Sequence, residues 1–261
     1  MRQTRTVVVP AYNEAETITS VVSALRESLL RPGIVDEILV VDDCSSDGTG
    51  RLARRAGARV VSTVDSAGLL GIGRPAGKSG GKGAAMHASL YAATTDVTGW
   101  VDGDVSGVDF SLFSRLFDPL SRGTVRLVKG TFQRVSDGML YGSGRVTSLT
   151  ARPLLSLLAP ELSGMRDPLS GVAAGRVEDL HLLDFEPDYG VDIGMTMDAC
   201  RLWGASSIVE VSLGRLTHRR RSLSSMENTA TQVARTILER SASRMSRITV
   251  DLGETPTLNS R

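Results

Sequence analysis

Apolar and polar positions along the first hundred residues follow two alternating periods. Short runs rich in valine and isoleucine predict strands at residues 4–12, 37–43, 58–63 and 99–104. Between these runs, three segments place apolar side chains at helical spacing, at residues 14–30, 47–57 and 81–95. Nearly continuous apolar strands that alternate with helices are typical of a parallel sheet covered on both faces. We therefore predict an α/β fold with a mainly parallel sheet flanked by helices.

The pattern changes after Gly107. Further strands are predicted at residues 125–132 and 207–214, and a long, mainly helical insert separates them at residues 143–204. The second half of the chain therefore extends the sheet but interrupts it with helices.

The end of the chain predicts one more helix. Residues 222–245 have amphipathic helical spacing, which is typical of a helix that packs on the domain or forms a dimer contact. The last eleven or so residues are polar and predict a flexible tail. We divide the chain into two halves of one domain, a C-terminal helix and a tail, at residues 1–107, 108–222, 223–250 and 251–261.

Polar side chains gather where the predicted strands end. They are Asn13, Glu14, Asp42, Asp43, Asp102 and Asp104. Ligands of open parallel sheets bind beyond the carboxyl ends of the strands, so these positions predict a crevice of nucleotide size.

Asp102 and Asp104 stand on either side of Gly103 in the stretch "WVDGDV". Residues two apart on a strand point to the same side, and a glycine between them allows a phosphate to approach closely. Hard oxygen ligands suit Mg²⁺ or Mn²⁺, which often bridge to substrate phosphates. The competing interpretation is a pair of solvated turn carboxylates, and the position after a strand of a parallel sheet favours the metal site.

Two other motifs fail on their spacing. The "GKS" at residues 77–79 lacks the P-loop glycine, because that position is Ile72. The "DGDVSG" segment begins like a calcium loop, but its last ligand position is Phe113 in place of glutamate. Both functions are excluded.

The composition limits the kinds of molecule that the protein is expected to bind. The 30 basic and 29 acidic side chains leave a net charge of +1, which provides no global attraction to nucleic acid or to an anionic membrane. Two cysteines make no disulfide framework, and no apolar run is long enough to cross a bilayer. We expect a soluble cytoplasmic protein without nucleic-acid or membrane partners.

Several motifs together carry a family resemblance. The segments "VVVPAYNEAETI", "VVDDCSSDGT" and "WVDGDV" resemble the nucleotide-diphosphosugar glycosyltransferases of GT-A fold, which is Rossmann-like. The segments "GKGAAMHASL", "GSGRVTSLTARPLLSLLAPEL", "PLSG", "DYGVDIG" and "THRRR" are similar, in the same order, to the actinobacterial glucosyl-3-phosphoglycerate synthases, which are retaining enzymes. The resemblance extends from about Thr6 to Thr231 and implies a helical insert on the acceptor side.

The resemblance implies a donor site for a UDP-sugar and a site for Mg²⁺ or Mn²⁺. The implied donor-binding residues are Pro10, Tyr12, Glu14, Asp43, Lys82, Asp102, Gly103, Asp104, Leu169, Tyr189 and Asp192. Lys82 is expected to neutralise the diphosphate, although Lys78 stands close enough in sequence to do so instead. The implied metal ligands are Asp104, His218 and Asp102, whereas His87 and His181 match no motif and are expected to be structural.

The stretch "GSGRVT" is the expected site of a small anionic acceptor. Gly144 exposes backbone N–H groups, Arg145 grips phosphate or carboxylate with two hydrogen bonds, and Thr147 adds a hydroxyl. The resemblance adds Val146 and Arg220, and Arg220 occupies a position where the family typically has asparagine. Asp192 similarly replaces a family glutamate, which shortens its reach by one methylene.

The resemblance therefore implies transfer of glucose from UDP-glucose to 3-phosphoglycerate, with Asp192, Lys82 and Arg145 as catalytic residues. No carboxylate stands out as a nucleophile, so we expect same-face substitution within an ion pair. By analogy with the family, the C-terminal helix is expected to form a homodimer. The alternatives are another small anionic hydroxy acceptor or another nucleotide sugar, and a binding protein that does not turn its ligand over.

Overall fold

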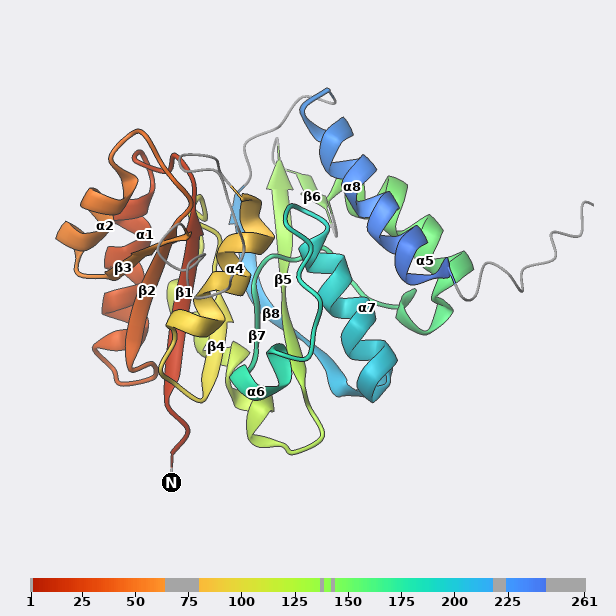
Figure 1. Cartoon of the computed structure of the whole chain (residues 1–261), viewed down its shortest axis with the longest axis horizontal. Coiled ribbons are helices and arrows are strands. Elements are labelled where there is room, and N and C mark those ends of the chain that lie inside the picture. Colours follow the sequence, from red (N-terminus) through yellow and green to blue (C-terminus); the bar gives the residue numbers. More distant parts are fainter. Residues whose placement is uncertain (1, 64–79, 137–138, 142–143, 218–223, 243–261) are drawn as a thin grey trace, which may run out of the picture.

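The computed structural model describes residues 2–63, 80–136, 139–141, 144–217 and 224–242 (Figure 1). Its centre is an eight-stranded sheet in the order β3-β2-β1-β4-β7-β5-β6, with β8 paired to β5. The strands are β1 (Arg5–Ala11), β2 (Glu37–Asp42), β3 (Arg59–Ser62), β4 (Val97–Trp100), β5 (Leu127–Ser136), β6 (Met139–Tyr141), β7 (Ala173–Arg176) and β8 (Ile208–Thr217). The first four strands pair in parallel, as do β5 and β8, which confirms the predicted mainly parallel sheet.

Helices cover both faces of the sheet (Figure 1). The longer ones are α1 (Ile18–Leu25), α2 (Thr49–Ala56), α4 (Gly81–Ala92), α5 (Arg152–Leu158), α7 (Val191–Trp203) and α8 (Ser224–Arg240). The short helical turns are η1 (Arg26–Leu30), η2 (Phe110–Leu116), η3 (Asp118–Ser121), η4 (Thr147–Ala151), η5 (Pro160–Leu162), α6 (Val177–Leu180) and η6 (Ala205–Ser207). None of the helices within these described ranges is both long and apolar enough to pass through a bilayer.

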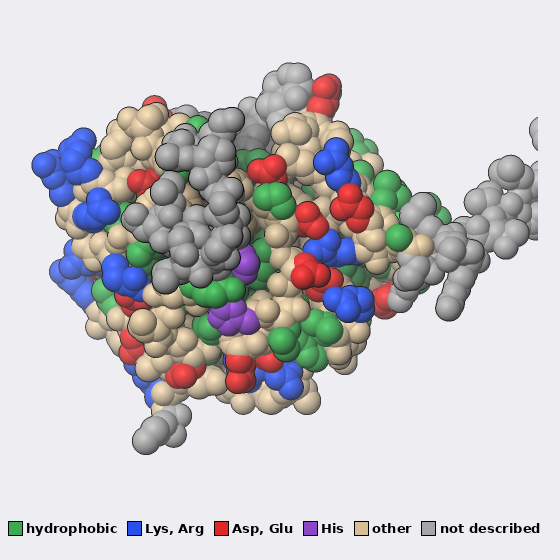
Figure 2. All heavy atoms as spheres, viewed as in Figure 1, with side chains coloured by type: hydrophobic (Ala, Val, Ile, Leu, Met, Phe, Trp, Pro, Cys, Tyr) green, Lys and Arg blue, Asp and Glu red, His purple; other side chains and the backbone are tan. Residues whose placement is uncertain are grey.

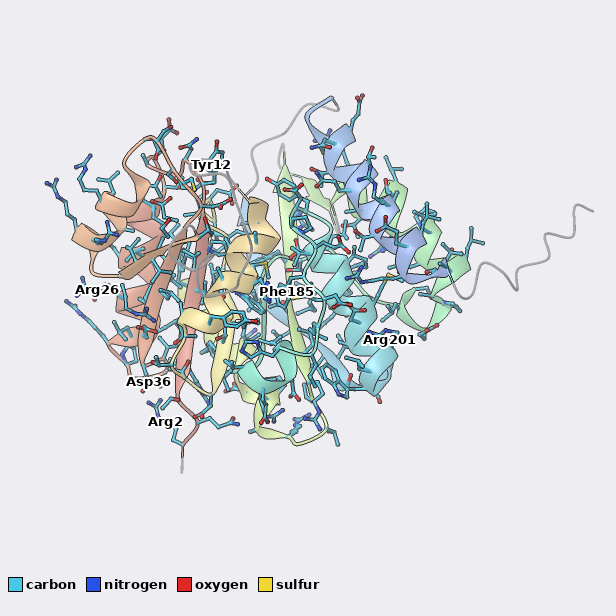
Figure 3. The ribbon with its side chains drawn as sticks, viewed as in Figure 1. Arg2, Tyr12, Arg26, Asp36, Phe185 and Arg201 are labelled. Carbon is cyan, nitrogen blue, oxygen red and sulfur yellow. The ribbon has the colours of Figure 1, made fainter. Side chains whose placement is uncertain are left out.

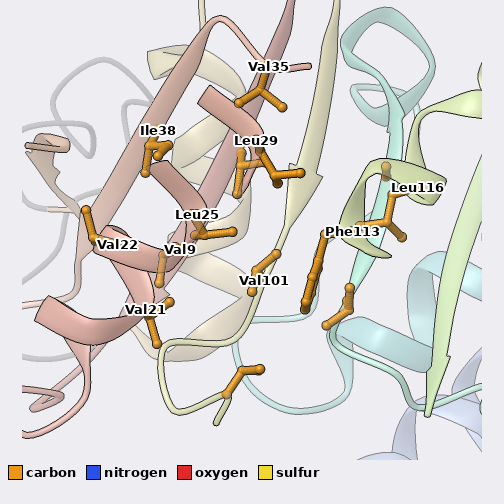
Figure 4. Close-up of a cluster of buried hydrophobic side chains, with 14 of the residues drawn as sticks. Val9, Val21, Val22, Leu25, Leu29, Val35, Ile38, Val101, Phe113 and Leu116 are labelled. Atoms are coloured by element: carbon orange, nitrogen blue, oxygen red, sulfur yellow. The ribbon is translucent and has the colours of Figure 1, made fainter. Parts of the chain in front are cut away.

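The alternation of β1 side chains explains the two covered faces. Val7 and Val9 point into a core shared with α1, α2 and η2, which includes the fully buried Phe113 (Figure 4). Val8 points the other way, into a core shared with α4 and α7. Successive residues of a strand face opposite sides, so a continuous valine run is the sequence of a strand buried on both faces.

The insert at residues 143–204 is mainly helical, as predicted, but it contains one strand that the sequence did not predict. β7 lies within that insert and pairs antiparallel with both β4 and β5. Its sequence is Ala173-Ala174-Gly175-Arg176, which has neither the β-branched side chains nor the alternation that predict a strand. Tertiary packing decides here, because a side chain on Gly175 would lie 2.8 Å from Leu180 and 3.0 Å from the carbonyl of Arg126.

Helix α8 packs on its own chain. Its Val233 and Ile237 are buried against α5 and α7, in a cluster that contains Leu155 and Ile193. Arg240 closes this contact, because its Nε lies 3.1 Å from Asp198 Oδ2 and its Nη1 lies 2.5 Å from Glu186 Oε1. Val233, Ile237 and Arg240 therefore pack α8 on its own domain, which is one of the two roles predicted for the C-terminal helix.

Candidate functional site

The predicted polar positions meet at one edge of the sheet. The parallel register places Pro10 beside Val41 and Ala11 beside Asp42, so β1 and β2 end at the same level. Tyr12 follows β1 and is 53% exposed. Figure 3 shows Tyr12 at the opposite end of the sheet from Arg2 and Asp36, which mark the amino end of the parallel strands. The carboxyl edge therefore carries the site, as expected for an open parallel sheet.

Lys82 lies at the centre of this edge, between two carboxylates. Its Nζ is 2.8 Å from Asp102 Oδ1 and 3.1 Å from Asp192 Oδ2. Burial alone would lower the pKa of Lys82, but the charges and hydrogen bonds of Asp102 and Asp192 outweigh burial and raise it. Lys82 therefore stays protonated and holds the end of β4 against the first turn of α7.

Glycines make this approach of α4 and α7 possible. A side chain on Gly83 would overlap the carbonyl of Glu186, and one on Gly81 would overlap the carboxylate of Asp188. Gly81 also has a φ of +81°, a conformation that residues with a Cβ rarely adopt. The first turn of α4 therefore presses against the segment before α7, which brings Lys82 to Asp192.

Gly171 brings a third segment to the same point. A Cβ on Gly171 would overlap Lys82 Nζ and would lie 2.6 Å from Asp102 Oδ1. The backbone at the end of the "PLSG" segment therefore covers the ion pair. Leu169 itself packs, partly buried, against the cluster of α5, α7 and α8.

The structure describes two of the three predicted metal ligands, Asp102 and Asp104. Asp104 is exposed just beyond β4, and the side chain of Asp102 is 36% exposed beside Lys82. Two carboxylates at a strand end are a hard oxygen donor set, which fits Mg²⁺ or Mn²⁺. Within the described residues no three metal-binding side chains come together, and the third predicted ligand, His218, lies outside those residues.

Gly103, Pro10 and Glu14 lie together, as a shared donor pocket requires. A Cβ on Gly103 would be 3.3 Å from Glu14 Cγ and 3.4 Å from the carbonyl oxygen of Pro10. The hydroxyl of Thr17 joins them by donating to Gly103 O at 2.8 Å and to Glu14 Oε2 at 2.9 Å. The loop after β1 and the loop after β4 therefore form one surface.

Asp43 makes hydrogen bonds within the protein that the sequence did not indicate. Only 2% of the residue is exposed, and its carboxylate accepts hydrogen bonds from the backbone N–H groups of Gly80 and Gly81 at 2.8–3.0 Å. The hydroxyl of Thr63 donates to it at 2.7 Å. A carboxylate at the first turn of a helix satisfies N–H groups that lack helical partners, so Asp43 fixes the start of α4.

The predicted acceptor block begins a helix. Residues 145 and 146 are helical and continue into η4, with Gly144 just before them. Arg145 is exposed, whereas Thr147 is 2% exposed and donates its hydroxyl to Asp167 Oδ1 at 3.4 Å. The helix start suits an anion, as expected, while Arg220 lies outside the described residues.

Tyr189 and Asp192 lie on either side of the start of α7. Tyr189 is 43% exposed, and its backbone N–H donates to Gln232 Oε1 at 3.2 Å. Asp192 is 5% exposed, and its Oδ1 has no hydrogen-bond partner in the described part of the chain, although Oδ2 contacts Lys82. A buried carboxylate oxygen without a partner is an acceptor ready for a ligand hydroxyl.

The two histidines expected to be structural lie away from this edge, on the face shown in Figure 2. The His87 ring stacks on Phe185 with centroids 5.2 Å apart, and Tyr91 meets the rings of both His87 and His181 edge-on. Burial, and to a smaller extent the nearby His181, lowers the pKa of His87. These contacts are those of a packed aromatic cluster.

Sequence reasoning missed Lys129, a fully buried lysine in β5. Its ammonium donates to the backbone carbonyl of Asp192 at 3.1 Å and so supports the residue that Lys82 contacts. Desolvation lowers the pKa of Lys129, and the positive charge of Lys82 adds to this, while Asp192, Asp167 and Asp102 act in the opposite direction. The signal was present, because a lysine inside the apolar run "VRLVKGTF" must be buried with the strand.

Lys129 makes the folding stability depend on pH. Between its lowered pKa in the folded protein and its ordinary value of 10.5, the unfolded chain binds more protons than the folded one, so stability rises with pH. We expect Lys129→Met to lose this rise. Urea unfolding of both proteins at several pH values from 7 to 10 measures it, and parallel free-energy profiles would contradict the assignment.

Three comparisons place the chain among known proteins. Residues 6–145 match the family model described as glycosyl transferase family 2. Glucosyl-3-phosphoglycerate synthase of Mycolicibacterium smegmatis is 40% identical over 91% of this chain and 78% of its own length. The synthase of that name from Mycobacterium tuberculosis strain H37Rv is 39% identical over 91% of this chain and 74% of its own length. A crystal structure of the M. tuberculosis enzyme with Mn²⁺, UDP-glucose and phosphoglyceric acid superposes with a TM-score of 0.81 at 39% identity, covering 92% of this chain and 80% of the other.

Proposed function

Because this chain belongs to glycosyl transferase family 2, we propose that it is a glucosyl-3-phosphoglycerate synthase, which transfers glucose from UDP-glucose to 3-phosphoglycerate. The observation that carries the proposal is the position of Lys82 between Asp102 and Asp192, at the strand edge where the family binds its donor. The solved relative was crystallised with Mn²⁺, UDP and glucosyl-3-phosphoglycerate, which supports this donor and product.

The donor would lie across the carboxyl edge. The uracil and ribose would contact Pro10, Tyr12, Glu14 and Gly103, with Asp43 supporting the nearby start of α4. Asp102, Asp104 and His218 would hold Mg²⁺ or Mn²⁺, which when bound stabilises negative charge on the diphosphate. Lys82 would shift from its carboxylates to the diphosphate oxygens.

The sugar would face Asp192. Its unpartnered Oδ1 would accept a hydrogen bond from a glucose hydroxyl. Leu169 and Tyr189 would line the same pocket. Its other oxygen is engaged by Lys82 at 3.1 Å, so Asp192 orients the sugar and does not act as the nucleophile. The retaining outcome then arises from same-face substitution within an ion pair.

The acceptor would bind at Gly144, Arg145, Val146 and Thr147, together with Arg220. Its hydroxyl oxygen forms the new bond to the anomeric carbon as the bond to the UDP oxygen breaks. The proton of that hydroxyl passes to the departing diphosphate, so no protein base is consumed. Trapping of a covalent glycosyl-enzyme would contradict this order of events.

Product analysis tests the function. The purified protein is incubated with Mg²⁺ or Mn²⁺, 3-phosphoglycerate and a panel of nucleotide sugars, and products are identified by mass spectrometry. We expect a glucosyl-phosphoglycerate mass with UDP-glucose that disappears with EDTA and returns when Mn²⁺ is added. Metal-dependent binding of UDP without turnover of any donor would instead indicate a binding protein.

The second candidate function has the same fold but uses a different donor sugar or a different acceptor. Asp192 is shorter than the glutamate of the family, so another sugar or another small anionic hydroxy acid is the specific alternative. It would show itself in the same assay as a different product mass, with the same loss in EDTA.

We also propose that the protein is a cytoplasmic homodimer without nucleic-acid or membrane partners. The net charge of +1 supports the absence of polyanionic partners, and Cys44 and Cys200, which form no disulfide, support a reducing environment. Leu149 and Leu157, which are 74% and 73% exposed on η4 and α5, provide apolar surface next to α8 for a second copy. Light scattering after size-exclusion chromatography measures the oligomeric state.

A further inference from the structure

Arg134 lies in the second half of β5, beside the start of the predicted acceptor helix. A Cβ built on Gly144 would be 3.9 Å from Arg134 Cζ and 3.7 Å from Thr147 Oγ1. The guanidinium therefore borders the same small space as two residues of the "GSGRVT" stretch. The sequence analysis did not single out this arginine.

A buried carboxylate holds Arg134 in this place. Its Nη1 lies 2.8 Å from Asp167 Oδ2, and the Asp167 side chain is only 1% exposed. The backbone N–H groups of Arg166 and Asp167 in turn donate to the carboxylate of Glu210, each at 2.9 Å. Both the backbone and the side chain of Asp167 are thus fixed, so the guanidinium has a defined position before any ligand binds.

The guanidinium keeps most of its donors available. Arginine carries five N–H groups in a planar fork, and within the described residues the ion pair with Asp167 is the polar contact that Arg134 makes. The side chain is 20% exposed, so it is open to a small ligand.

We propose that Arg134 binds an oxyanion of the acceptor, with Asp167 as the positioning residue that orients it. The inference rests on the proposed function, in which the acceptor is a small hydroxy acid that carries a phosphate. Such a molecule has two oxyanions, which can engage Arg134 as well as Arg145 and Arg220 of the proposed acceptor site. A planar guanidinium fixed on one side binds a phosphate or a carboxylate through two parallel hydrogen bonds.

The residue just before the same strand provides a matched control. Arg126 precedes β5 and forms an ion pair with the buried Asp179 at 2.9 Å, as Arg134 does with Asp167. Arg126 lies over the ring of Trp203, and its carboxylate partner also receives Arg176, so this pair is part of the scaffold. A purely structural role for Arg134 would make the two arginines behave alike.

The test compares Arg134→Met with Arg126→Met and with the wild-type enzyme. We expect Arg134→Met to raise the KM for 3-phosphoglycerate about 30-fold and to leave the KM for UDP-glucose within about twofold. Arg126→Met should lower the Tm and leave both KM values unchanged. Arg134→Lys, which keeps the charge but loses the fork, should fall between the wild type and Arg134→Met.

Truncated acceptors identify the oxyanion. If Arg134 contacts the phosphate, the loss disappears with glycerate; if it contacts the carboxylate, the loss disappears with glycerol 3-phosphate. Either result supports the proposal. Equal losses with both truncated acceptors, or acceptor KM values like those of Arg126→Met, would overturn it.

Binding separates this inference from the proposed function. Wild-type product formation reports on the function, whereas the rise in Tm that each of the three acceptors causes reports on Arg134 without turnover. If Arg134→Met does not fold, Arg134→Lys carries both measurements. An acceptor-induced rise in Tm that is the same in wild type and variant would overturn the proposal even if the wild type is fully active.

Discussion

Replacing Lys82 with methionine is expected to reduce glucosyl transfer by about a thousandfold. Lys82 is the cation between Asp102 and Asp192, at 2.8 and 3.1 Å, and the diphosphate would lose the charge that stabilises it as it departs. The effect should lie in kcat more than in the KM for UDP-glucose, since the need for the charge grows as the bond breaks. Steady-state kinetics with UDP-glucose and 3-phosphoglycerate measures it.

The same variant also leaves two carboxylates facing each other without a cation. The side chain of Asp192 is only 7% exposed, so we expect a loss of about 3 kcal/mol in the free energy of unfolding without added metal. Adding Asp192→Asn to Lys82→Met removes the repulsion and should restore most of that stability. Activity should stay low in the double variant; recovery of activity with stability would show that Lys82 has only a structural role.

Gly171→Ala is expected to reduce transfer by about a hundredfold while leaving the fold intact. The new methyl group would overlap Lys82 Nζ and lie 2.6 Å from Asp102 Oδ1, so the ammonium group and the carboxylate must be displaced from their present positions. Displacement of a charged group by about 1 Å is enough for a loss of this size. The measurement is kcat at saturating substrates, together with far-UV circular dichroism.

Gly164→Ala is the matched control for this variant. A Cβ on Gly164 meets no atom within 4 Å, and its backbone conformation is one that alanine adopts easily. We expect wild-type kinetics and an unchanged Tm. Equal losses in Gly164→Ala and Gly171→Ala would mean that the loss arises from general destabilisation and not from the displaced ion pair.

Sequence periodicity predicted the first half of the sheet well, because buried strands need continuous apolar runs. β1, β2 and β3 fall within the predicted ranges, whereas β4 begins at Val97, two residues before its predicted range, and ends at Trp100. Gly57 ends α2 in the left-handed conformation. The same reasoning failed for β7, whose small residues carry no strand pattern, although β7 pairs with β4 and β5 and has no room for a side chain at Gly175.

Side-chain pairing was the least predictable part of the site. Lys82 and Asp192, and likewise Arg134 and Asp167, are far apart in sequence, and no local pattern records which charges will meet. The family resemblance supplied the candidates Lys82, Asp102 and Asp192, but not the contacts among them. Asp43 shows the reverse case. The resemblance implied that its carboxylate binds the donor, but in the structure it also accepts a hydrogen bond from a backbone N–H group at the start of α4, because a carboxylate accepts N–H donors of either kind.

The place of β7 in the sheet sets an order of assembly. The parallel unit β3-β2-β1-β4 is formed from the first hundred residues, whereas β4 reaches β5 only through β7, which comes much later in the chain. During synthesis, the first hundred residues therefore have their strand partners well before the rest of the chain does. The pairing of β7 with β4 and the pairing of β8 with β5 both wait for later segments of the chain, and the rate of these long-range closures is expected to limit how fast the enzyme reaches its active form.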